Sequence, residues 1–159
     1  MAIADTGDRT FAQINVVPRS GFEFNNDADL TLAYGSFNQT NDQFSFGGHS
    51  NRFAYYTSLI RNRTDLGLEP PVLQVSHAMG SGEGLFTTMS YKRGPSEQFD
   101  WTATARNDQF QIPVDPNNLD PASTSYAFMR DRDQEKDSFM HLTWTHTVNS
   151  NTLLTVSPF

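Results

Sequence analysis

Two histidines are the side chains of this chain with the most direct capacity for metal chemistry. His141 and His146 lie five positions apart, which places them on opposite faces of a strand. A metal site needs ligands that converge on the ion at about 2.0–2.6 Å. The spacing therefore predicts no metal site, and His146, which lies near a turn, is expected to be an interfacial aromatic residue.

An acidic run repeats a carboxylate at every second position: Asp131, Asp133, Glu135 and Asp137. Carboxylate oxygens bind hard cations such as Ca²⁺, but the run lacks the glycine that an EF-hand turn requires. Basic residues interleave with the carboxylates and neutralise much of their charge (Arg130, Arg132 and Lys136). We expect a solvated loop or strand rim here rather than a cation site.

The sequence contains no recognisable catalytic motif. The glycine-rich stretch Gly80–Gly84 is not followed by the Lys-Ser or Lys-Thr pair of a phosphate-binding loop. Neither a G-x-S-x-G nucleophile elbow nor an S-x-x-K motif occurs in the chain. We therefore predict that the chain is not an enzyme and uses no cofactor.

Polar residues in two long predicted loops are the candidates for ligand contact. The loops cover residues 64–83 and 108–136, and prolines or glycines interrupt both of them. A receptor meets its ligand through loops of this kind, although ordinary solvated loops have similar side chains. The candidates are Glu69, His77, Glu83, Asp115 and Asp120.

Short segments with alternating apolar and polar residues must position these loops. The alternation is clearest in Asp29–Gly35 and Gln98–Arg106. Because successive side chains of a strand point to opposite sides, each segment has one apolar and one polar face. This pattern is typical of the wall of an outer-membrane β-barrel, with lipid on one side and a lumen on the other. The residues expected to face lipid are Leu30, Leu32, Tyr34, Phe44, Phe46, Phe99, Trp101, Ala103, Met140, Leu142 and Trp144.

Seven strands are expected, and the connections between them alternate in length. Variable or long connections follow the first, third and fifth strands, as long extracellular loops and short periplasmic turns would require. The sequence thus predicts an all-β fold, an antiparallel up-and-down meander that forms a partial transmembrane β-barrel wall of about seven strands. The expected strands cover residues 29–37, 41–48, 52–62, 84–92, 97–107, 137–148 and 152–159.

Composition and charge narrow the class of protein. Only 36% of the residues are apolar, yet 13% are aromatic, which suits a wall in which alternate positions are apolar. A net charge of −7 argues against nucleic-acid binding. The chain has no cysteine, no apolar run long enough for a transmembrane helix and no signal peptide after Met1. Because an exported protein needs an export signal, we expect the chain to be a fragment.

Several stretches resemble one family of bacterial membrane proteins. Ile14–Gly21 reads Ile-Asn-Val-Val-Pro-Arg-Ser-Gly, and the alternating segments Leu30–Phe37, Asp42–Gly48 and Arg52–Ser58 follow it. The first stretch resembles the end of the plug domain in TonB-dependent outer-membrane receptors, and the three segments look like the opening of their barrel. Asn149–Leu154 resembles a further turn and strand start.

This resemblance implies that residues 1–22 are a remnant of the plug domain and its linker. Residues 23–159 would be the N-terminal portion of a transmembrane barrel of roughly 22 strands. It further implies a location in the outer membrane of a Gram-negative bacterium, in contact with lipid. The TonB–ExbB–ExbD complex would act through a missing N-terminal part. The parent protein would take up a scarce nutrient, such as a ferric siderophore, a vitamin or a carbohydrate.

A soluble all-β carbohydrate-binding module is the alternative interpretation. Its exposed aromatic side chains would recognise sugars, and its composition would be similar. A soluble sandwich has no reason to gather its long loops at one edge, which favours the barrel wall.

Overall fold

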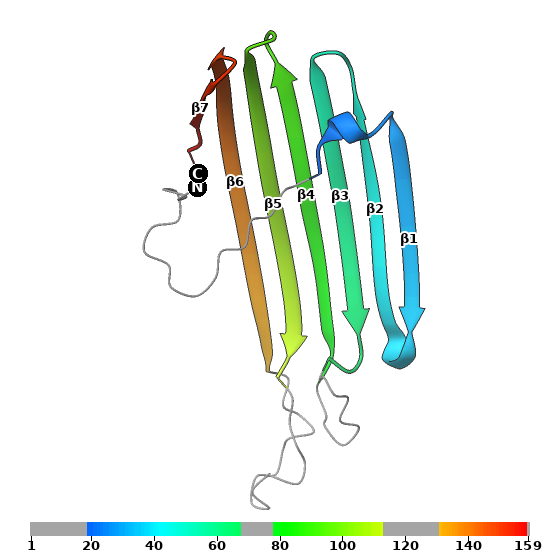
Figure 1. Ribbon diagram of the computed structural model, residues 1–159. Coiled ribbons are helices and arrows are strands. Elements are labelled where there is room, and N and C mark those ends of the chain that lie inside the picture. Colours follow the sequence, from blue (N-terminus) through cyan, green and yellow to red (C-terminus); the bar gives the residue numbers. More distant parts are fainter. Residues whose placement is uncertain (1–18, 68–77, 113–130, 159) are drawn as a thin grey trace, which may run out of the picture.

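The fold is a single antiparallel sheet of seven strands. The computed structural model describes residues 19–67, 78–112 and 131–158, and 74% of them lie in strands. Consecutive strands are hydrogen-bonded neighbours, in the order β1-β2-β3-β4-β5-β6-β7 (Figure 1). The predicted all-β antiparallel meander is confirmed. The strands are β1 (Asp27–Gly35), β2 (Gln39–His49), β3 (Phe53–Thr64), β4 (Gly80–Lys92), β5 (Glu97–Gln111), β6 (Arg132–Asn149) and β7 (Thr152–Val156).

The sheet does not close on itself. Within the described residues, β1 pairs only with β2 and β7 pairs only with β6. A free strand edge presents N–H and C=O groups that can pair with a further strand. The seven strands therefore form an open wall with two free edges. No helix in the described part of the chain has the length and apolar character needed to cross a membrane.

Three short connections between strands lie at one end of the sheet, and the two long connections lie at the other end (Figure 1). Residues 50–52, 93–96 and 150–151 connect strands at one end, which we call the tight-turn end. Residues 65–79 and 112–131 connect strands at the opposite end, which we call the long-loop end. A short 3₁₀ turn, η3 (Ser36–Asn38), joins β1 to β2 at that end as well. The predicted alternation of tight and variable or long connections is confirmed.

Three strands extend by four or five residues further toward the long-loop end than the sequence predicted, and β2 and β3 extend by two. β4 begins at Gly80, β5 ends at Gln111 and β6 begins at Arg132. The boundaries predicted for the loops 64–83 and 108–136 are therefore wrong, by up to five residues at one end.

Polar side chains stabilise these extensions. Gln134 donates from Nε2 to Oδ1 of Asn107 at 2.8 Å, which links β6 to β5. Asn107 in turn donates from Nδ2 to Oε1 of Glu83 on β4 at 3.3 Å. Backbone pairing needs no apolar side chains, and cross-strand polar pairs add to it. The strands therefore continue beyond the apolar part of the sequence from which they were predicted.

Residues 19–26, the N-terminal segment, pack on one face of the sheet near the tight-turn end (Figure 1). Phe24 stacks on Tyr56 of β3 with ring centroids 4.8 Å apart, and Tyr56 is only 4% exposed. Thr88 of β4 donates from Oγ1 to the carbonyl of Arg19 at 3.1 Å. The segment thus covers Tyr56, an aromatic residue that interrupts the alternation of β3.

Gly21 allows the N-terminal segment to approach the sheet closely. This residue lies in a short 3₁₀ turn, η2 (Gly21–Glu23), which Ser20 caps by accepting a hydrogen bond from the backbone N–H of Phe22. A Cβ atom at Gly21 would overlap the backbone of Tyr55 in β3. Only a residue without a side chain fits this approach between two backbones.

Replacing Gly21 by Ala is expected to push the N-terminal segment away from β3. The expected loss of stability is about 1–3 kcal/mol, the usual cost of overpacking a close contact. Urea unfolding in dodecyl maltoside micelles, followed by circular dichroism, measures it. Gly94→Ala is the matched control, because nothing lies within 4 Å of a Cβ built at that residue. Equal stability of the two variants would contradict the packing described here.

Candidate functional site

Backbone pairing divides the side chains of the sheet between two faces of different chemistry. Paired residues on neighbouring strands lie on the same face, so the alternation within each strand carries through the sheet. The face called apolar below carries all the residues expected to face lipid: Leu30, Leu32, Tyr34, Phe44, Phe46, Phe99, Trp101, Ala103, Met140, Leu142 and Trp144. It also carries Phe53, Tyr55, Leu59, Leu85, Met89 and Tyr91. The polar face carries Asp29, Gln43, Ser45, Ser58, Thr88, Ser90, Asp100, Thr102, Thr104 and Thr143, among others.

Many large side chains of the apolar face are exposed. Leu32 is 69% exposed, Tyr34 78% and Met140 64%. The N-terminal segment does not cover them, because it packs on the polar face through Tyr56 and Thr88. A contiguous apolar surface spanning several strands is rare on soluble monomers and marks contact with a membrane or a partner.

An aromatic row borders the apolar face at the tight-turn end. Phe53, Tyr91, Phe99 and Trp144 occupy paired positions on β3, β4, β5 and β6. The other tryptophan of the chain, Trp101, lies two residues from Phe99 on the same face. Aromatic side chains concentrate at the interfaces of membrane-spanning walls. Four aromatic residues in one paired row match that composition.

A polar and mostly charged row borders the apolar face at the long-loop end. Asp42, Arg61, Glu83, Asn107 and Lys136 occupy paired positions on β2 to β6. The next row toward the tight-turn end is apolar on β2 to β5, where it consists of Phe44, Leu59, Leu85 and Ala105. The apolar side chains therefore form a belt with two defined borders, the aromatic row and this charged row.

The borders of the belt follow rows of paired residues. From β2 to β5 the apolar row nearest the long-loop end consists of Phe44, Leu59, Leu85 and Ala105, and the polar row beyond it continues to Lys136 on β6. Only the two end strands depart from these rows: β1 continues to Tyr34, and β6 carries Ser138 opposite Ala105. The belt therefore runs across the strands with one step at β1 and another at β6.

Glu83 lies in a strand and not in a loop, which corrects its predicted position. It is the fourth residue of β4 and stands between Arg61 and Asn107 in the charged row. The prediction was wrong because backbone pairing continues through the glycine-rich stretch Gly80–Gly84. The other candidates for ligand contact lie outside the described residues: Glu69, His77, Asp115 and Asp120.

The polar face is connected by hydrogen bonds between short side chains. Ser90 donates from Oγ to Asp100 at 2.6 Å, and Gln98 donates from Nε2 to both oxygens of the same carboxylate at 2.8 and 2.9 Å. Nearer the long-loop end, Arg106 forms an ion pair with Asp108. Such groups require water or polar partners, so this face is suited to an aqueous interior.

The two histidines lie on opposite faces, as their spacing predicts. His141 pairs with Thr102 on the polar face, whereas His146 pairs with Glu97 on the other side, 3.7 Å from its carboxylate. The acidic residues Asp133, Glu135 and Asp137 extend along β6. In the part of the chain that the structure describes, no three His, Asp or Glu side chains gather as metal ligands would.

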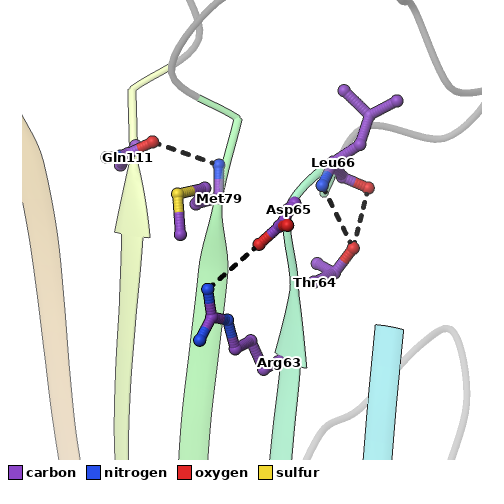
Figure 2. Close-up of polar contacts among 6 residues, drawn as sticks. All are labelled: Arg63, Thr64, Asp65, Leu66, Met79 and Gln111. Atoms are coloured by element: carbon purple, nitrogen blue, oxygen red, sulfur yellow. Dashed lines mark hydrogen bonds and ion pairs between the residues drawn. The ribbon is translucent and has the colours of Figure 1, made fainter. Parts of the chain in front are cut away.

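Hydrogen bonds join the strand ends at the long-loop end (Figure 2). The backbone N–H of Met79 donates to Oε1 of Gln111 at 3.3 Å, and the N–H of Gln111 donates to the carbonyl of Met79 at 2.8 Å. Arg63 of β3 pairs with Asp65 at 3.3 Å. These contacts fix the end of the sheet where the charged row lies.

The sequence analysis did not identify three arginines at this end as a group. Arg61, Arg63 and Arg132 all lie on the apolar-face side of the sheet and line one hollow. Arg132 had been assigned to a loop and Arg63 lay just beyond a predicted strand. Arg61 and Arg63 are two positions apart, as residues on one face of a strand are. This spacing could have shown that β3 continues beyond Asn62.

Comparison of the chain with protein-family models, curated proteins and solved structures found no match. The two faces of the sheet and the borders of the belt are therefore the features that indicate a function.

Proposed function

We propose that this chain forms part of the wall of an outer-membrane β-barrel, in a receptor of the TonB-dependent type. The belt is the observation that carries the proposal. It is apolar and largely exposed, and it ends at an aromatic row on one side and a charged row on the other. Lipid contact satisfies all of these features together, because it buries the apolar belt and leaves both borders at the membrane interfaces.

The N-terminal segment supports the identification of the polar face with the lumen. Residues 19–26 run along this face and continue directly into β1. In the family that the sequence resembles, the plug fills the lumen and its last residues lead into the first barrel strand. The proposal assigns the residues up to 22 to the plug remnant and residues 23–159 to the barrel.

The proposed function is energised uptake of a scarce nutrient by binding and gated passage, with no bond made or broken. The long-loop end would face the outside, where Glu69, His77, Asp115 and Asp120 are candidates for ligand contact. Outer-membrane lipid would cover the belt, and the TonB–ExbB–ExbD complex would supply the energy. The ligand belongs to the class of ferric siderophores, vitamins or carbohydrates.

The two tryptophans allow the belt to be tested, because Trp101 and Trp144 both lie on the apolar face. In micelles of dodecyl maltoside with brominated alkyl chains, we expect strong quenching of the fluorescence of Trp101 in the Trp144→Phe variant. The matched probe is Thr102→Trp in a chain without its native tryptophans, since Thr102 lies on the polar face. This probe should be quenched several-fold less.

Two results, one from this experiment and one from sizing and thermal unfolding without detergent, would contradict the proposal. Equal quenching at positions 101 and 102 would mean that the apolar face does not contact the alkyl chains selectively. A monodisperse, cooperatively unfolding monomer in buffer without detergent would instead support the soluble carbohydrate-binding module, because an uncovered belt should cause such a chain to aggregate.

Charge placed on the belt should destabilise the fold. Ala103→Arg is expected to lower the free energy of unfolding in micelles by about 2–4 kcal/mol, the cost of arginine near the middle of a membrane wall. Thr102→Arg on the polar face should cost far less, since the guanidinium stays hydrated there. Urea unfolding of the two variants measures the difference. If both substitutions prove equally mild, the belt does not contact lipid.

A further inference from the structure

Two adjoining hollows lie on the apolar-face side of the sheet at the long-loop end. The first, of about 280 Å³, is lined by Arg61, Arg63 and Arg132 together with Ser81 and Gln109. Its side chains come from β3, β4, β5 and β6, so the sheet itself assembles it. Three guanidinium groups and two neutral hydrogen-bonding side chains around one hollow form a site for an anion.

Among the described residues that line this hollow, none is an aspartate or a glutamate. Within the described residues, neither Arg61 nor Arg132 forms an ion pair. Arg63 pairs with Asp65, but their side chains are 49% and 43% exposed, and exposed pairs of this kind are weak. Asp42 and Glu83 flank Arg61 in the charged row and compensate part of its charge, but neither carboxylate lines the hollow beside Arg63 and Arg132.

The second hollow is larger and apolar on one side. It has a volume of about 650 Å³ and shares Arg61 with the first. One side is formed by the charged row. The other side is formed by the part of the belt next to that row, including Phe44, Leu59, Leu85 and Ala105. A molecule that occupied both hollows would need an anionic group at one end and an apolar chain at the other.

We propose that the two hollows bind one phosphate-bearing lipid of the membrane leaflet at the long-loop end. Its phosphate lies among Arg61, Arg63 and Arg132, and its acyl chain lies on the belt beside Leu59 and Leu85. Arginine suits this role because its planar group donates two parallel hydrogen bonds to phosphate oxygens. The proposal rests on the proposed function, since it requires the belt to lie in lipid.

The test compares two lipids that differ only in the phosphate. The full chain in dodecyl maltoside is titrated with dioleoyl phosphatidic acid or with dioleoylglycerol, and native mass spectrometry counts the bound lipid. We expect phosphatidic acid to bind at least tenfold more tightly. Equal binding of the two lipids would overturn the proposal. Inorganic phosphate that competes as well as the lipid would also overturn it, because the acyl chain would then contribute nothing.

Two double variants with the same change in net charge locate the site. Arg61→Gln with Arg132→Gln should lower the affinity for phosphatidic acid to that for dioleoylglycerol. Arg52→Gln with Arg93→Gln removes two exposed arginines near the tight-turn end and should leave the affinity within twofold. An equal loss in both double variants would overturn the site, because it would reflect net charge alone.

Quenching by brominated detergent separates this proposal from the proposed function. If Trp101 is quenched but phosphatidic acid has no advantage, the lipid site is wrong and the membrane wall stands. If Trp101 is not quenched either, both proposals fail.

Discussion

Backbone hydrogen bonding between neighbouring strands is the interaction on which the rest of the structure depends. Each of the six strand pairs is antiparallel, and the register assigns every side chain to one face of the sheet. Because the side-chain period is two, a shift of one residue in any pair would move apolar residues to the polar face. The belt, its borders and the hollow lined by arginines all exist only in this register.

The N-terminal segment packs where the alternation of apolar and polar residues breaks down. Tyr56 and Phe86 lie on the polar face, with ring centroids 6.1 Å apart, and Phe24 stacks on Tyr56 from above. The segment thus provides the polar face with a small apolar cluster of its own. Lys92 places its Nζ 4.0 Å from the ring centroid of Phe22, which adds a cation–π contact at the edge of this cluster.

Much of the fold could be predicted because alternation and turn residues are local signals. The strand order, the tight turns and the shared face of Leu30, Phe44 and Trp101 follow from them. The strand ends could not be predicted, because charged and glycine residues near Gly80 and Arg132 carry no apolar period. Glu83 was assigned to a loop for that reason. The hollow lined by arginines depends on side chains from strands far apart in the sequence, which only the register brings together.

The borders of the belt set a requirement for any further strand that pairs with a free edge. From β3 to β6 the aromatic row and the charged row are each a single row of paired residues. A strand added at an edge keeps the belt continuous only if its apolar side chains lie between these two rows and on the same face. A strand shifted by two residues would form the same backbone hydrogen bonds and still leave a step in the belt. The borders therefore select among possible edge partners by register, independently of backbone hydrogen bonding.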